Sequence, residues 1–205
     1  MMKIPFFHKP RSADHDCAPV CLQMALAYFQ IDSELPAIYL DARCLGPTHF
    51  ALPWGICLAA AKWGLYARFI SRHPDVLINE SVVARATGLT DVQVRHEVRE
   101  QLKECHDSEI ALVQYDENTH KSLPARVVAR ASKSEVVIPS LVWGWQDVHN
   151  VVLTDSKDGI VTYHEPNTTF GANQEITETE FLERWCDDHT DNDLLIISND
   201  PLWPR

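Results

Sequence analysis

The sequence predicts an α+β fold, in which a helical N-terminal lobe packs against a C-terminal lobe of mainly antiparallel strands. In the first half, apolar residues recur every three or four positions, as in amphipathic helices, whereas strand-like apolar runs dominate from Glu109 onward. The 205 residues suffice for one domain with a substantial core. We therefore expect a single domain over 1–205, divided into a mainly helical lobe (1–107) and a mainly β lobe (108–205), with a cleft between them.

The first lobe is expected to contain helices over residues 17–30, 35–44, 54–63 and 92–105. The first helix follows Asp16, a residue type favoured as an N-cap, and carries Pro19 in its first turn, where proline is tolerated. Gly46-Pro47 and Gly64 mark the ends of the second and third helices. The fourth helix has only a narrow apolar stripe, so most of its charged surface should face solvent.

Strands are expected at 66–71 in the first lobe and at 110–115, 136–143, 148–154, 160–164 and 194–198 in the second. Asp158-Gly159, between two of these runs, is typical of a two-residue hairpin turn. A short helix over 178–186 is predicted before the last strand. The second lobe should therefore be built mainly from neighbouring antiparallel strands.

Composition and charge disfavour several functional classes. A formal net charge of −11 argues against nucleic-acid binding through a basic surface. Residues 1–10 lack the apolar segment of a signal peptide, and no apolar run of about 18 residues predicts a membrane span. Six scattered cysteines without a zinc-ligand spacing predict reduced thiols, no metal and no other cofactor. We expect a cytoplasmic protein.

Cys17 is the best candidate for a nucleophile because it is predicted to begin a helix. A cysteine nucleophile needs a stabilised thiolate, a general base and a group that holds the base. The dipole and the unpaired amides of a helix N-terminus favour the thiolate, and the backbone N–H of Cys17 would point towards a developing oxyanion. The competing interpretation is a buried structural cysteine, which we prefer for Cys21, one helical turn deeper.

The segment Asp16-Cys17-Ala18-Pro19 resembles the Asp-Cys-Gly-Pro nucleophile motif of the double-glycine leader peptidases, which process bacteriocin precursors, and of their stand-alone relatives. In that family a strand begins with histidine and an apolar run, a hairpin follows, and the next strand ends in Asp-Pro. Here His149-Asn150-Val151-Val152-Leu153, Asp158-Gly159 and Glu165-Pro166 follow in the same order. The resemblance implies a papain-like fold, with the active-site cleft between the helical lobe and the β lobe.

The resemblance also implies a catalytic triad of Cys17, His149 and Glu165. Glu165 stands where the family has aspartate and keeps a carboxylate on a longer arm, and Ala18 replaces the glycine after the nucleophile. The family places an oxyanion-hole glutamine six residues before the cysteine, where this chain has Arg11. Arginine can donate to an oxyanion through a bulkier, charged fork. Loss of one oxyanion donor costs on the order of 100- to 1000-fold in rate.

The residue that orients His149 remains open between Glu165 and Asn167. Residues that are opposite each other, or offset by two, share one face of an antiparallel pair. A register that places either candidate opposite His149 keeps both on its face, whereas a register with Pro166 opposite turns both away.

Other residues near the expected site have weaker claims. His15, two residues before Cys17, is a competing base, although neighbours along the backbone seldom align for proton transfer. His164 should point away from His149, because it precedes Glu165 in the same strand. The remaining candidates for oxyanion or substrate contacts are Arg11, Asp16, Trp143 and Trp145.

The predicted function is therefore a cysteine hydrolase, in the first place a peptidase that cleaves a peptide or amide bond in a peptide or protein substrate through a thioester. The same triad serves deamidases and acyltransferases, which the sequence does not separate from peptidases. A second hypothesis is a catalytically impaired papain-like module that binds a peptide in the cleft, motivated by Arg11 and Glu165.

Overall fold

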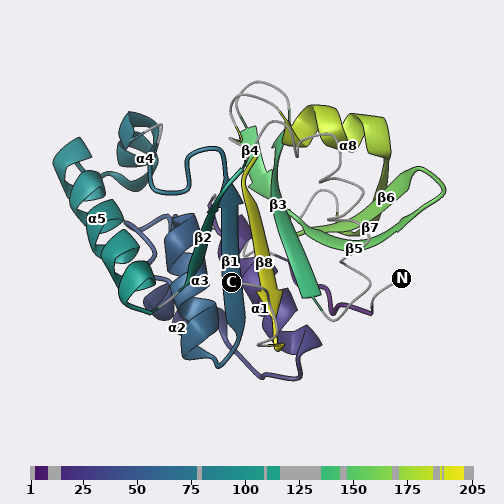
Figure 1. Cartoon of the computed structure of the whole chain (residues 1–205), viewed down its shortest axis with the longest axis horizontal. Coiled ribbons are helices and arrows are strands. Elements are labelled where there is room, and N and C mark those ends of the chain that lie inside the picture. The colour runs from purple at the N-terminus through teal and green to yellow at the C-terminus, as the bar shows by residue number, and fades with distance from the viewer. Residues whose placement is uncertain are drawn as a thin grey trace.

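The computed structural model describes residues 3–8, 15–77, 80–108, 110–115, 135–143, 147–167, 171–186, 190 and 192–200. Within these ranges the protein is a layered α+β structure (Figure 1). A five-stranded sheet stands between a layer of helices and a three-stranded sheet that carries one further helix. No helix in the described part of the chain combines the length and apolar character that a membrane span requires.

The central sheet has the strand order β2-β1-β8-β3-β4. Its strands are β1 (Tyr66–Ser71), β2 (Ala111–Gln114), β3 (Glu135–Trp143), β4 (Asp147–Asn150) and β8 (Leu194–Ser198). The β1·β2 pair is parallel, whereas the pairs β1·β8, β3·β8 and β3·β4 are antiparallel. β1 and β8 have the predicted bounds. The sheet thus draws its strands from both sides of the predicted boundary at residue 107.

The helices of the first lobe are α1 (Cys17–Tyr28), α2 (Leu35–Asp41), α3 (Pro53–Lys62), α4 (Glu80–Thr87) and α5 (Asp91–Asp107). Four of them confirm predicted helices, and α4 was not predicted. The start of α5 is fixed by a capping box, in which the Gln93 N–H donates to Thr90 Oγ1 (3.3 Å) and the Thr90 N–H donates to Gln93 Oε1 (2.9 Å).

The second sheet consists of β5 (Val152–Lys157), β6 (Ile160–Glu165) and β7 (Gly171–Thr177), followed by α8 (Glu178–Trp185). Asp158 and Gly159 join β5 to β6 with positive φ values of 53° and 78°. Two successive left-handed residues make the turn that the Asp-Gly pair predicts. β7 was not predicted, because its sequence, Gly-Ala-Asn-Gln-Glu-Ile-Thr, contains few of the apolar residues that indicate a strand.

The prediction of one continuous strand over 148–154 was wrong. The chain runs along β3 as β4, passes Val151, and continues from Val152 as β5 in the other sheet. The Val151 N–H still donates to the Pro139 carbonyl of β3 (3.2 Å), so the switch occurs within a single residue. Because His149 and Asn150 stay in β4, the last strand of the central sheet, they lie beside α1.

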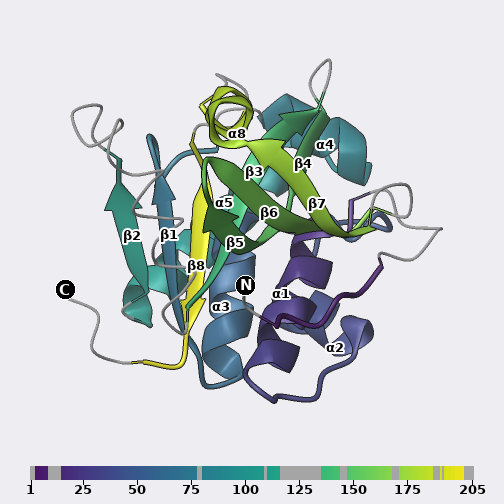
Figure 2. The same ribbon diagram turned by 90° about the vertical axis from the view of Figure 1, so that its right-hand side faces the viewer.

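Two apolar clusters cover the two faces of the central sheet. Alternate residues of β3 divide between them: Val136 and Ile138 pack towards the helices, and Val137 and Leu141 towards the three-stranded sheet. Figure 2 looks onto the three-stranded sheet, with α8 above it and α1 beside it. The packing on both faces fixes the position of β4 relative to the start of α1.

Candidate active site

Cys17 is the first residue of α1, as predicted. The first amides of a helix have no acceptor within the helix, so they concentrate positive potential at the Cys17 end of α1. The Cys17 side chain is partly exposed, whereas all the buried residues of α1 lie after it in the helix. The fold therefore presents this thiol at the polar, accessible end of an otherwise buried helix.

Asp16 occupies the N-cap position, but its carboxylate does not cap the helix. It is fully buried, accepts a hydrogen bond from the Tyr39 hydroxyl and lies 3.8 Å from His49 Nδ1. The His49 ring stacks on the Tyr39 ring with centroids 4.0 Å apart. Burial and the bond to Asp16 raise the pKa of Tyr39, which remains a donor. Asp16 thus ties α1 to α2 and to the loop before α3 and does not line the cavity described next.

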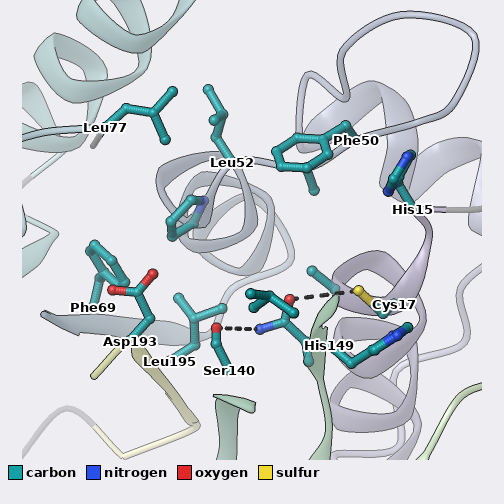
Figure 3. A pocket seen from close by; sticks show the side chains of 15 residues that line it. His15, Cys17, Phe50, Leu52, Phe69, Leu77, Ser140, His149, Asp193 and Leu195 are labelled. Atoms are coloured by element: carbon teal, nitrogen blue, oxygen red, sulfur yellow. Dashed lines mark hydrogen bonds between the residues drawn. The ribbon is translucent and has the colours of Figure 1, made fainter. Parts of the chain in front are cut away.

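Cys17 and His149 line the same cavity, which has a volume of about 180 Å³. His149 lies in β4 opposite Leu141 of β3, on the other face of the strand from Asn150, and its ring lies near Cys17 at the start of α1 (Figure 3). The apolar side chains that enclose the cavity come from α1, from α3 and the loop before it, from β1 and the segment after it, and from β4 and β8: Ala18, Phe50, Ala51, Leu52, Pro53, Phe69, Leu77, Val148 and Leu195. The thiol and the imidazole therefore share a small, largely apolar space.

Asn150 was missed by sequence reasoning, although its side chain is the group that hydrogen-bonds to Cys17. The Cys17 thiol faces Asn150 Oδ1 at 3.7 Å, and Asn150 Nδ2 donates to Ser140 Oγ at 3.0 Å. The Cys21 thiol donates to the Asn150 main-chain carbonyl at 3.3 Å. The only signal in the sequence was its place directly after His149, which does not reveal that its side chain faces α1.

Glu165 and Asn167, the alternatives for the group that orients His149, lie two residues apart and are joined by a hydrogen bond. Glu165 is 2% exposed and its Oε1 accepts from the Asn167 N–H at 2.9 Å. Val152 pairs with His164 at the end of the β5·β6 ladder. If the same pairing were extended by three residues, Asn167 would lie opposite His149. In that register both Asn167 and Glu165 would be on the same face as His149. The ladder ends earlier because β4 belongs to the central sheet.

The two other histidines considered have different surroundings. His164 is buried: its Nδ1 accepts from the Asn173 N–H at 3.1 Å, and its Nε2 lies 3.0 Å from the Ile4 carbonyl. Burial lowers the pKa of His164, so the ring is neutral and bridges the N-terminal segment to β7. His15 lines the same cavity as Cys17 and packs against the Phe50 ring, with centroids 5.7 Å apart.

Two predicted contact residues, Arg11 and Trp145, lie outside the described residues, and Trp143 is the last residue of β3. Trp54 and Trp185 are core residues, each 1% exposed. Their indole N–H groups donate to the carbonyls of Pro74 (2.7 Å) and Asp193 (3.1 Å).

The other five thiols are poor nucleophiles. Burial raises the pKa of Cys21 and Cys57 well above the ordinary value of 9.0, and Cys17 and Glu165 raise that of Cys21 further. Burial also raises the pKa of Cys44 and Cys105 to about 12 and that of Cys186 by a smaller amount. All six cysteines lie in the described part of the chain, and none is in a disulfide. A thiol reagent at neutral pH should therefore discriminate among them.

Sulfur, imidazole and amide are the chemical groups that the structure brings together here. Within the described residues, no three His, Cys, Asp or Glu side chains come together in a set that could hold a metal ion. A thiol and an imidazole in one cavity can carry out proton transfer and nucleophilic attack.

Comparison with known proteins identifies similarity at the level of the fold. No protein-family model and no curated protein matches the chain. The peptidase domain of Streptococcus ComA, a bi-functional ABC transporter involved in a quorum-sensing pathway, superposes with a TM-score of 0.57 at 12% sequence identity, covering 96% of this chain and 99% of that domain.

A double glycine motif protease from an AMS/PCAT transporter, solved in complex with the leader peptide, gives a TM-score of 0.49 at 14% identity, covering 95% of this chain and 91% of that one. The likeness to the ComA domain extends over 96% of the chain, so it includes both layers that border the cavity. The chain therefore has a papain-like α+β fold, the fold of the ComA peptidase domain.

Proposed function

We propose that this protein is a cysteine peptidase that cleaves a peptide bond with Cys17 as nucleophile, His149 as general base and Glu165 as the residue that orients His149. The observation that supports this most strongly is that Cys17, at the start of α1, and His149, in β4, line one cavity although they are far apart in the sequence. The fold shared with a peptidase domain supports the same reaction class.

In the proposed reaction, His149 takes the proton of the Cys17 thiol, and the thiolate attacks the carbonyl carbon of the substrate. The N–H groups at the start of α1 stabilise the resulting oxyanion. The imidazolium then protonates the leaving amine, the C–N bond breaks, and a thioester remains on Cys17. A water molecule, deprotonated by His149, attacks the thioester and releases the acid and the free thiol.

Glu165 has two properties that suit an orienting group. It is a buried carboxylate at the end of β6, and the Asn167 N–H fixes one of its oxygens. A buried carboxylate near an imidazole stabilises the imidazolium that forms during the reaction. Asn167 remains the alternative, since its backbone already holds Glu165 in place.

The test is hydrolysis of a peptide mixture prepared by tryptic digestion of a bacterial proteome, with new N-termini identified by mass spectrometry. We expect the wild type and the matched control Cys186→Ala to cleave the same peptides, and Cys17→Ala to cleave none of them. Cleavage by Cys17→Ala at the wild-type rate would overturn the proposal.

A peptide-binding module without catalysis is the second candidate, because Arg11 replaces the glutamine that supplies an oxyanion donor in the similar family. Under this alternative, the wild type and Cys17→Ala would retain the same peptides from the mixture and neither would cleave them. The peptidase proposal thus predicts cleavage that depends on Cys17, whereas the binding-module proposal predicts peptide retention without cleavage.

A further inference from the structure

The side chain of Asn150 lies between the Cys17 sulfur and the Ser140 hydroxyl (Figure 3). Ser140 and Asn150 are direct cross-strand partners in the β3·β4 pair, so their side chains share the face of the sheet that is turned to α1. Ser140 is 8% exposed, and both residues line the cavity that contains Cys17 and His149. The amide is thus part of the site rather than of the surrounding core.

The structure shows the amide in the orientation that suits a protonated thiol. The Cys17 S–H donates to Oδ1, and Nδ2 donates to Ser140 Oγ. A thiolate has no proton to donate, so the same orientation would place two electron-rich atoms against each other. A rotation of the amide by 180° about its last side-chain bond replaces Oδ1 by Nδ2 next to the sulfur.

Ser140 can satisfy both orientations. A serine hydroxyl accepts from Nδ2 in the first orientation and donates to Oδ1 in the second, so the rotation leaves neither polar group unpaired. A hydrophobic residue at position 140 would leave one end of the amide without a partner in either orientation. The pair Asn150–Ser140 is therefore built to present either an acceptor or a donor to Cys17.

The backbone of Asn150 is held independently of this rotation. The Cys21 thiol, one turn after Cys17 on α1, donates to the Asn150 carbonyl at 3.3 Å. Cys21 is completely buried, and its raised pKa keeps it protonated and able to donate. Two cysteines on the same face of α1 thus contact one residue, Cys17 through its side chain and Cys21 through its main chain.

We propose that Asn150 is a catalytic residue that donates a hydrogen bond from Nδ2 to the Cys17 thiolate, and that Ser140 is the positioning residue that permits this orientation. This inference rests on the proposed function, since it assumes that Cys17 reacts as a thiolate. Asn150 would then supply an amide donor in the cavity. The sequence before Cys17 contains no glutamine, and residue 11 is arginine. The donor comes from the β lobe, on the strand that also carries His149.

The experiment measures the rate of Cys17 alkylation by iodoacetamide from pH 5 to pH 10, with mass spectrometry to follow the Cys17 peptide. Asn150→Ala removes the donor, and we expect the pH midpoint of the rate to rise by about one unit, equivalent to about tenfold slower alkylation at neutral pH. Asn150→Asp keeps the shape but places a carboxylate at the sulfur, so its midpoint should rise further, by roughly one to two units.

Two variants separate this contact from general effects. Val148→Asp adds the same charge to the cavity wall from the neighbouring part of β4, without replacing the amide, and should shift the midpoint less than Asn150→Asp does. Ser140→Ala removes the hydroxyl that donates to Oδ1 when Nδ2 faces the sulfur, so its midpoint should rise, by less than in Asn150→Ala. A midpoint in Asn150→Ala equal to that of the wild type, in a protein with a normal melting curve, would overturn the proposal. An equal shift in Val148→Asp and Asn150→Asp would overturn it as well.

The alkylation assay needs no substrate, so its result is distinguishable from failure of the proposed function. If the wild type cleaves no peptide but Asn150→Ala raises the midpoint, the peptidase proposal fails and the role of Asn150 towards Cys17 stands. If the wild type cleaves peptides and the Asn150 variants keep its alkylation profile, only the role of Asn150 fails.

Discussion

Gly55, the third residue of α3, lies where the helix touches the end of α2. A Cβ atom at this position would lie 2.2 Å from the Ala42 main-chain oxygen and 2.9 Å from Gln101 Oε1. The nearer neighbour is backbone and cannot rotate away, so α3 would have to move by about 1 Å to restore an ordinary contact. We therefore predict that Gly55→Ala destabilises the protein by steric overlap.

The size of the effect follows from two opposing contributions. Overpacking in a core costs about 1–3 kcal/mol, and alanine in place of glycine within a helix returns about 1 kcal/mol. A contact with backbone falls at the upper end of the first range, so a net loss of about 1–2 kcal/mol is expected. For a chain of 205 residues this corresponds to a melting temperature lowered by roughly 2–8 °C.

The assay is thermal unfolding followed by circular dichroism, combined with the alkylation rate of Cys17. Ala61→Ser is the matched control, because it also adds one heavy atom to α3 but at an exposed position. Leu52 and Pro53, three and two residues before Gly55, line the cavity. Gly55→Ala should therefore change the Cys17 alkylation rate, whereas Ala61→Ser should not. A melting temperature of Gly55→Ala at or above that of the wild type would refute the steric argument.

Two further predictions concern buried polar groups. Trp54→Phe removes the indole donor to the Pro74 carbonyl (2.7 Å) and should lower the free energy of unfolding in urea by about 1–3 kcal/mol; an unchanged midpoint would contradict it. Burial lowers the pKa of His164 below its ordinary value of 6.5. As the pH falls, His164 is therefore protonated in the unfolded state before it is protonated in the folded state. Its contribution to the free energy of unfolding should be complete above pH 6.5 and should decrease as the pH drops below that value. His164→Gln should weaken this decline between pH 7 and pH 5, and an identical decline in the variant would count against the assignment.

Much of the fold could be predicted because the relevant signals are local. Cys17 and Pro19 at the start of an apolar helical repeat give the beginning of α1, and Asp158-Gly159 gives the hairpin between β5 and β6. The same holds for β1 and β8, whose apolar runs are bounded by polar residues or glycine.

The errors arose where tertiary pairing decides the outcome. Residues 148–154 form an apolar run that fits either sheet, and only the competition between β3 and β6 for partners breaks it at Val151. Asp16 could cap α1 on its own, but Tyr39, brought in by α2, takes its carboxylate instead. α4 was missed because it has only eight residues, although its apolar residues lie on one face, and α4 packs on α5 rather than on a sheet.

The candidate site shows the same division. Motif order could predict that Cys17 and His149 lie in one site, but not that Asn150 contacts Cys17, since this contact depends on which face of β4 is turned to α1. That face is set by the pairing of Asn150 with Ser140, a contact that no local pattern around either residue indicates.

The central claim, that Cys17 and His149 act as a pair, is tested most directly by the alkylation of Cys17 at pH 6.5 in the wild type and in His149→Ala. The pairing predicts that limiting iodoacetamide labels Cys17 before the other five thiols in the wild type, and that His149→Ala slows Cys17 labelling by about tenfold or more. Equal rates of Cys17 labelling in the two proteins, or uniform labelling of all six thiols in the wild type, would contradict it.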